Sequence, residues 1–202
     1  GGQAGQYEPL IRQMREWMPL MRDYARRFAG VEEGVMLPHG ANDRGGLADV
    51  NWKCQFDAGS APWIALMLWD WYRYTGDREV LAEVIFPMLT GSVRLYEAMI
   101  NESPGRDTLW GPSPEYNDPG ITAWSANPSF HLALLHRLVP TVAAAAGVLG
   151  REPPELARWQ ALLSRMPRAT VESGEIAIGQ GVMLEQSHRH HSHLAGIYPC
   201  EV

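Results

Sequence analysis

Apolar side chains recur at helical spacing along most of the chain, and this pattern predicts its main elements. Between Tyr7 and Phe28 an apolar residue falls at every third or fourth position, which predicts an amphipathic helix. Pro19 lies inside this run and predicts a kink, because proline removes one helical hydrogen bond. Arginines and acidic residues fill the opposite face, which indicates a solvated surface rather than a basic groove.

Two further apolar runs predict a helical hairpin. The run from Trp63 to Tyr74 is apolar nearly all round, which predicts burial on most sides. Ser60 is in position to cap this helix, with Pro62 in its first turn. Thr75-Gly76-Asp77 ends it and caps the next helix, whose apolar period continues from Leu81 to Met99. A tight turn of this kind favours two antiparallel helices.

The same period returns in the second half of the chain. It predicts helices from Phe130 to Ala145 and from Leu156 to Met166, with start signals at Asn127-Pro128 and at Glu152-Pro153-Pro154. Strand-like alternation is confined to short pieces, such as the one from Gly174 to Leu184. The chain is therefore predicted to be mostly α-helical.

Two long polar segments interrupt the helices, residues 34–57 and 102–126. Loops of this length in a compact domain are typically functional, and their polar and aromatic side chains suit sugar binding or catalysis better than a linker. An ordinary surface crossing is the alternative for the first segment. If helix pairs wind round one axis, the long loops emerge at one end. The segment from His39 to Asp57, the segment Ser113-Pro114-Glu115 and the histidines at 188–193 would then share one mouth. No repeat of solenoid period is present, which favours a closed toroid over an open array.

Composition limits the classes of protein and partner. With 202 residues, 46% of them hydrophobic and 20% charged, the chain is expected to form one globular domain. A net charge of -6 argues against a nucleic-acid or anionic-membrane partner. Cys54 and Cys200 have no disulfide or metal-site spacing. The start of the chain carries no signal peptide, so the compartment is left open, and export of a longer protein, to the periplasm or outside the cell, stays compatible with it.

A histidine-rich segment near the C-terminus is the densest cluster of candidate ligands. Four of the seven histidines fall within six residues: His188, His190, His191 and His193. Arg189 and two serines stand among and beside them. A metal site, a structural network and a substrate-binding wall are the three interpretations. No helical pair of histidines or acidic ligand fixes a metal geometry, so no metal or cofactor is predicted and substrate binding is favoured.

Glu115 is the candidate for proton chemistry. It lies between Pro114 and Tyr116, with Trp110 and Trp124 nearby in the sequence. An aromatic, desolvated setting favours the protonated form of a carboxyl, as a general acid requires. The alternative is a loop glutamate paired with an arginine.

These residues resemble a known family. The segment from His188 to Pro199 is similar to the His-Arg-His-x-Ser-His-Leu-x-Gly-Leu-Tyr-Pro segment of glycoside hydrolase family 95, the α-L-fucosidases and their relatives. Trp63 to Asp77 resembles a barrel helix of that family and its Tyr-x-x-Thr-Gly-Asp turn, and Ser113-Pro114-Glu115 resembles its Ser-Pro-Glu. The resemblance extends from Tyr7 to Pro199.

The resemblance implies a fold and a domain organisation. The expected fold is an all-α (α/α)6 toroid of the six-hairpin glycosidase type, incomplete in this chain. Residues 1–202 would form a single domain, the central part of that barrel. The family's Asn-x-Asn segment would lie upstream in a longer protein, preceded by a β-sandwich domain.

The resemblance also implies an inverting glycoside hydrolase that needs no cofactor. Glu115 would be the general acid, and Asp43, Asp49 and Asp57 are the candidates for the base, of which we take Asp57. The residues expected to bind the carbohydrate substrate are His39, Asn51, Trp52, Trp63, Trp124, His188, Arg189, His190 and His193.

The substrate is less defined than the chemistry. The segment from Asp57 to Pro62 replaces a Trp-Pro-Met-Gly-Gly-like approach in the family, which removes an aromatic wall and adds a carboxylate. Another glycan is therefore as compatible with the sequence as an α-L-fucoside. A helical domain that binds a carbohydrate without cleaving it is the alternative function.

Overall fold

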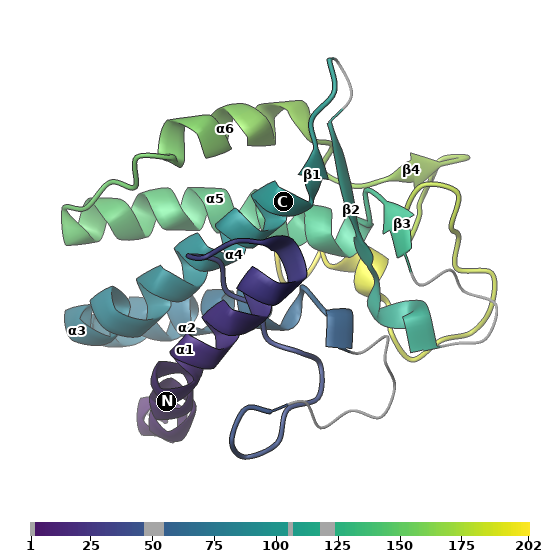
Figure 1. Cartoon of the computed structure of the whole chain (residues 1–202). Coiled ribbons are helices and arrows are strands. Elements are labelled where there is room, and N and C mark those ends of the chain that lie inside the picture. The colour runs from purple at the N-terminus through teal and green to yellow at the C-terminus, as the bar shows by residue number, and fades with distance from the viewer. Residues whose placement is uncertain (1–2, 47–54, 105–106, 118–123) are drawn as a thin grey trace.

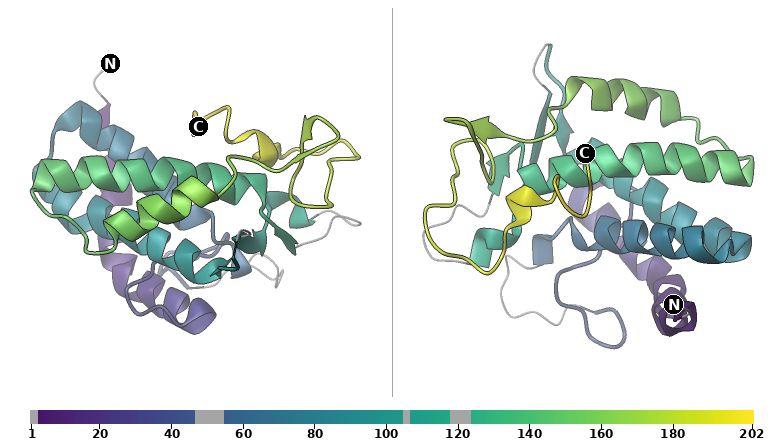
Figure 2. Two further views of the ribbon diagram at one scale, coloured as in Figure 1. Left: turned by 90° about the horizontal axis from the view of Figure 1, so that it is seen from above. Right: turned by 180° about the vertical axis from the view of Figure 1, so that it is seen from behind.

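The computed structural model describes residues 3–46, 55–104, 107–117 and 124–202 (Figure 1). The long helices lie together on one side of the molecule, while short strands and extended loops gather at one end of them, as both further views also show (Figure 2). The predicted mostly α-helical class is confirmed.

The helices follow the apolar period of the sequence. Their bounds are α1 Glu8–Ala29, preceded by the 3-10 turn η1 Ala4–Tyr7, α2 Ser60–Thr75, α3 Arg78–Val80, the π-helical segment η3 Leu81–Ile85, α4 Phe86–Met99, α5 Ser129–Leu149 and α6 Leu156–Arg165. α3, η3 and α4 follow one another without a break, so they form the single helix expected after the turn. Each predicted helix is present, with its ends shifted by a few residues.

α5 is the central helix of the core. It packs against α4, α2 and α6, and its buried side chains include Phe130, Leu134 and Leu138. Because helices cover it on several sides, it is apolar nearly all round. Its length and composition alone would also suit a membrane span, a property that the core helix of a soluble protein shares.

The turn between α2 and α3 has the predicted chemistry. Gly76 ends α2 in the left-handed conformation, with φ at 70°, which glycine adopts without steric cost. The Asp77 carboxylate accepts hydrogen bonds from the backbone N–H groups of Glu79 (3.1 Å) and Val80 (3.0 Å). These bonds satisfy two donors that a helix start otherwise leaves unpaired.

The prediction of an irregular segment 102–126 was wrong in part, because the structure contains a small sheet there. Antiparallel strands β1 Ile100–Asn101, β2 Thr108–Pro112 and β3 Trp124–Ala126 pair in the order β1-β2-β3. A two-stranded hairpin, β4 Val171–Glu172 and β5 Glu175–Ile176, follows α6. The strands have two to five residues, too short for the alternation of side chains to be visible in the sequence.

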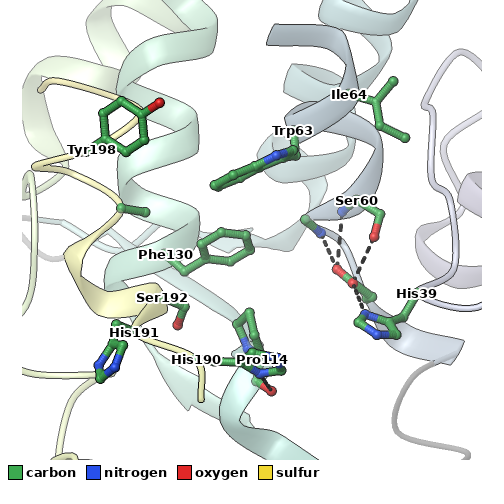
Figure 3. Close-up of a pocket in the computed structure, with 13 residues that line it drawn as sticks. His39, Ser60, Trp63, Ile64, Pro114, Phe130, His190, His191, Ser192 and Tyr198 are labelled. Carbon is green, nitrogen blue, oxygen red and sulfur yellow. Dashed lines mark hydrogen bonds and ion pairs between the residues drawn. The ribbon is translucent and has the colours of Figure 1, made fainter. Parts of the chain in front are cut away.

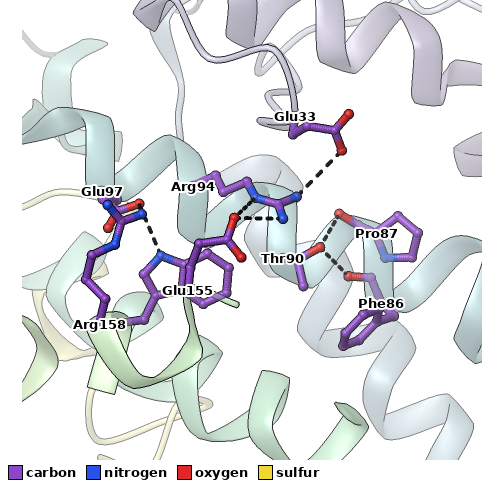
Figure 4. Close-up of polar contacts among 9 residues, drawn as sticks. Glu33, Phe86, Pro87, Thr90, Arg94, Glu97, Glu155 and Arg158 are labelled. Carbon is purple, nitrogen blue, oxygen red and sulfur yellow. Dashed lines mark hydrogen bonds and ion pairs between the residues drawn. The ribbon is translucent and has the colours of Figure 1, made fainter. Parts of the chain in front are cut away.

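Ion pairs connect α4 to α6 (Figure 4). Arg94 on α4 donates to Glu155 just before α6 (3.1 Å) and lies 3.7 Å from Glu33. Glu97, one turn further along α4, accepts from Arg158 (2.8 Å) and from the Trp159 indole (3.1 Å). The two acceptors and their partners fix the position of α6 on α4.

We predict that Asp77→Ala lowers the free energy of unfolding by about 1 kcal/mol, since it removes a helix cap. Urea denaturation at neutral pH measures this loss. Asp70→Ala is the matched control, because Asp70 makes only an exposed ion pair with Arg73 (3.4 Å), which contributes little. Equal losses in the two variants would contradict a capping role for Asp77.

Candidate active site

A pocket of about 410 Å³ opens at the end of the helices where the long loops meet (Figure 3). Its walls come from the loop before α2, the turn after β2 and the histidine-rich segment, together with the first turns of α2 and α5. The lining residues are His39, Asp57, Gly59, Ser60, Trp63, Ile64, Pro114, Phe130, His190, His191, Ser192, Ala195 and Tyr198. The three segments expected to share one mouth therefore meet.

The Asp57 carboxylate organises one wall of the pocket. Its Oδ1 accepts hydrogen bonds from the backbone N–H groups of Gly59 (2.6 Å) and Ser60 (3.3 Å) at the start of α2. Its Oδ2 accepts from the Ser60 hydroxyl (2.9 Å) and lies 3.3 Å from His39 Nδ1. The predicted capping role of Ser60 was wrong: Asp57 satisfies the helix start, and the Ser60 hydroxyl donates to Asp57 instead.

Asp57 is buried yet stays ionised. Burial alone would raise the pKa of this carboxyl, but the hydrogen bonds from His39, the Gly59 N–H and the Ser60 hydroxyl lower it below the ordinary value of 3.8. Because a carboxylate only accepts, His39 carries its proton on Nδ1. The ring is thereby oriented at the edge of the pocket, where His39 is exposed.

An aromatic surface forms the inner part of the pocket. The rings of Trp63 and Phe130 lie 5.8 Å apart at an angle of 33°, and 38% of Trp63 is exposed. Gly59 makes this arrangement possible, because a Cβ at that position would lie 2.3 Å from Phe130 Cε1. Figure 3 shows both rings between the side that carries Ser60 and His39 and the side that carries His191 and Ser192.

Glu115 lies behind the opposite wall, in the 3-10 turn η4 Pro114–Asn117. Its exposed fraction is 0%, and its carboxyl contacts Ser192 at the start of the 3-10 turn η5 Ser192–Leu194. The Ser192 N–H donates to Oε1 (3.0 Å) and the Ser192 hydroxyl bonds to Oε2 (2.6 Å). Ser192 and Pro114 line the pocket, so Glu115 is separated from it by one layer of side chains.

The histidine-rich segment is fixed to the same turn. His190 Nδ1 lies 3.0 Å from the carbonyl oxygen of Pro114, and since a carbonyl only accepts, Nδ1 carries the proton. A neutral His190 then has Nε2 left as a hydrogen-bond acceptor. His188 Nδ1 accepts from the His190 N–H (2.8 Å), which tightens the turn.

His193 lies near Glu115 rather than in the pocket lining. Burial lowers its pKa below 6.5, although the charge of Glu115 acts in the opposite direction. Its Nδ1 is buried and has no hydrogen-bond partner among the described residues. Arg189 is exposed, and neither it nor His188 is among the residues that line the pocket.

A buried histidine supports the turn that carries Glu115. His131 on α5 bonds through Nδ1 to the Tyr96 hydroxyl on α4 (2.9 Å) and through Nε2 to the carbonyl oxygen of Pro112. Burial lowers its pKa below 6.5, so the ring is neutral at pH 7 and its one proton lies on Nε2. The end of β2 is therefore attached to both helices.

The remaining predicted residues are placed elsewhere. Trp124 lines no wall of this pocket and packs against Phe28, with ring centroids 6.2 Å apart. Asp43 is exposed and does not line the pocket either. Asn51 and Trp52, together with Asp49, lie outside the described residues.

Sequence reasoning did not single out Phe130, Ser192 and Tyr198, which the structure adds to the pocket. Ser192 stands inside the histidine-rich segment, and its small hydroxyl side chain gave no separate signal there. In the sequence, Phe130 is one more apolar residue at the start of a helix, and nothing there indicates that its ring faces a pocket. Within the described ranges, no three His, Cys, Asp or Glu side chains are grouped so as to hold a metal ion.

Comparison with known proteins identifies a family. The sequence profile of the glycosyl hydrolase family 95 catalytic domain matches residues 4–202, nearly the whole chain. The comparison with curated proteins found no match.

We predict a pH-dependent stability contribution from Asp57. Its pKa is lower in the folded than in the unfolded chain, so the unfolded chain binds the proton at higher pH. The contribution is complete above about pH 4 and is lost as the pH falls through the folded-state pKa. Asp57→Asn should therefore destabilise the protein by about 1–3 kcal/mol at pH 7, and by less with increasing acidity.

Urea denaturation of wild type and variant between pH 3 and pH 7 measures this difference. Asp43→Asn is the control, since Asp43 is exposed and should change stability little. If the loss of unfolding free energy in Asp57→Asn were the same at every pH from 3 to 7, the charge of the Asp57 carboxylate would not be what stabilises the start of α2.

Proposed function

Because the chain belongs to glycosyl hydrolase family 95, and is therefore a glycosidase that acts on a carbohydrate, we propose that it cleaves a glycosidic bond in the pocket between Asp57 and Ser192 with inversion at the anomeric carbon. The observation that carries this proposal is the convergence of Pro114, His190 and Asp57 on one pocket with an aromatic surface. A volume of about 410 Å³ lies within the range of small-molecule sites.

We extend the proposal to the fold. Residues 1–202 form one domain, the central part of an (α/α)6 toroid whose loops surround the pocket. Family membership supports this architecture, and so does the gathering of long loops at one end of the helices.

Glu115 is proposed as the general acid. Its Ser-Pro-Glu sequence and its position behind Pro114, next to the pocket, support this role. Ser192 stands between the carboxyl and the pocket, since its hydroxyl bonds to Oε2 and its side chain lines the pocket. Proton delivery to the glycosidic oxygen therefore requires the Ser192 hydroxyl to rotate away from Oε2 or to relay the proton.

Asp57 is proposed as the base that activates the attacking water. It is ionised at neutral pH and lies in the wall across the pocket from Ser192, as an inverting mechanism with two separated carboxyl groups requires. Its two oxygens accept four hydrogen bonds from three residues, His39, Gly59 and Ser60. A water can therefore bind Asp57 only where the Ser60 hydroxyl or the His39 ring gives up its bond.

We propose an α-L-fucoside, or another glycoside with an apolar edge, as the substrate. Trp63, Ile64 and Phe130 form an apolar wall that suits the 6-methyl group and the C–H face of a deoxyhexose. His190 Nε2 and the Ser60 hydroxyl are polar groups near the same space and would bind sugar hydroxyls.

Glu115→Gln should reduce kcat/KM for an unactivated α-L-fucosyl oligosaccharide by about 10²–10⁴-fold, because the amide has no proton to donate in the transition state. Glu185→Gln, a change at an exposed glutamate in the loop before the histidine-rich segment, is the control and should leave activity unchanged. Melting temperatures show whether each variant is folded. Near-normal hydrolysis by Glu115→Gln would reject the acid assignment, and glycan binding without hydrolysis by wild type would favour a non-catalytic carbohydrate-binding domain.

Inversion has its own test. Proton NMR of the first sugar released should show the anomer opposite to that of the substrate, β-L-fucose from an α-L-fucoside, before mutarotation mixes the two. Initial release of the same anomer would indicate a covalent intermediate and would contradict the proposed water attack.

A further inference from the structure

A second cavity of about 600 Å³ lies at the three-stranded sheet and uses none of the residues that line the first pocket. Its walls come from all three strands and from the turn 180–182 that follows β5. The side chains that matter for its chemistry are Asn101, Thr108, Trp110, Trp124 and Gln180.

Two tryptophans dominate the cavity. The strand register pairs Trp110 with Ala126 and Pro112 with Trp124, so both indoles project from the same face of the sheet. Trp124 is held by Phe28 and Phe56, with ring centroids 6.2 Å and 6.4 Å away. Trp110 is different, since 48% of it is exposed. The cavity thus has one indole anchored in the protein and one indole face open to a ligand.

The polar groups of the cavity are neutral. They are amides and hydroxyls, and no described residue that lines the cavity carries a charge. Phosphates, carboxylates and ammonium groups would find no opposite charge here. A ligand with many hydroxyl groups and flat C–H faces suits both features, because amides and hydroxyls bond to hydroxyls and an indole packs on C–H groups. Sugar rings have this chemistry.

The turn 180–182 is held beside β3 by hydrogen bonds from its backbone N–H groups. The Gln180 N–H donates to the carbonyl oxygen of Ala126 (2.9 Å), and the Gly181 N–H donates to Glu172 Oε1 (2.6 Å). Gly179 allows this close approach, since a Cβ there would lie 2.1 Å from Ser125 Oγ. A site fixed by such bonds loses little entropy when a ligand binds.

The second cavity is close to the first pocket along the chain. Trp110 precedes Pro114 by four residues, a span of at most about 14 Å for an extended chain. We propose that the second cavity is a separate carbohydrate-binding site, which holds a part of a neutral glycan remote from the bond that is cleaved. This inference rests on the proposed function for the identity of the ligand, but its binding does not require cleavage.

Affinity electrophoresis tests the proposal with native gels that contain xyloglucan, galactomannan or arabinoxylan as neutral probes and polygalacturonate as an acidic one. We expect at least one neutral polysaccharide to retard the wild-type protein, and polygalacturonate to have no effect. Trp110→Ala should weaken the retarding interaction at least tenfold, and Gln180→Ala should weaken it by a smaller factor.

Tyr74→Ala is the matched control, because Tyr74 is 91% exposed at the far end of α2 and should not change retardation. Hydrolysis of a short oligosaccharide by Trp110→Ala should equal that of wild type, and loss of that activity with unchanged retardation would overturn the proposal. So would the absence of retardation by every neutral probe, or equal retardation of Trp110→Ala and wild type. Glu115→Gln should be retarded like wild type, so a failure of the catalytic assignment and a failure of this binding site give different results.

Discussion

The bond between Glu115 and Ser192 is the contact on which the shape of the pocket depends. The last 26 residues of the chain contain only one short 3-10 turn, so regular backbone pairing does little to hold them. Ser192 meets the Glu115 carboxyl with both its N–H and its hydroxyl, and His190 bonds to the neighbouring carbonyl of Pro114. A buried carboxyl without such partners would cost several kcal/mol, so burial of Glu115 and docking of the histidine-rich segment stabilise each other. The proposed acid is thus also an anchor, and the melting temperature of a Glu115 variant carries information of its own.

Whether a feature of the fold can be predicted from the sequence depends on how far apart in the chain the residues that determine it lie. The helices from Glu8 to Ala29 and from Ser129 to Leu149 are local, since an apolar period of 3.6 residues identifies them. The sheet is not local: β2 and β3 have five and three residues, and they are strands because they pair with each other. The same limit explains Trp124. Its residue type suggested a sugar-stacking face, but the strand register decides which cavity it faces, and it turns out to line the second cavity instead of the first.

Around Asp57, prediction from the sequence fails for a different reason. Ser60 was predicted to cap α2, but the backbone geometry gives that role to Asp57. Asp57 takes both N–H groups because it stands before the first turn, while Ser60 is already the first residue of α2. Gly59 between them is required by Phe130, a residue 71 positions later in the chain. Long-range packing of this kind leaves no pattern in the local sequence.

β2 connects the two cavities mechanically. Its middle residue is Trp110, and after its last residue, Pro112, the chain runs into the turn with Pro114 and Glu115. The neutral His131 fixes the carbonyl of Pro112, between Trp110 and Glu115, and is itself held by Tyr96, so the end of the strand is attached to α4 and α5. A strand fixed in this way cannot slide when a ligand packs on Trp110, because sliding would break the bond to a buried ring. The separation between the second cavity and Glu115 is therefore set by the backbone of β2 and of the turn that follows it. A long glycan seated on Trp110 would meet the pocket at a constant distance, which favours bonds at a particular number of sugar units from the bound segment.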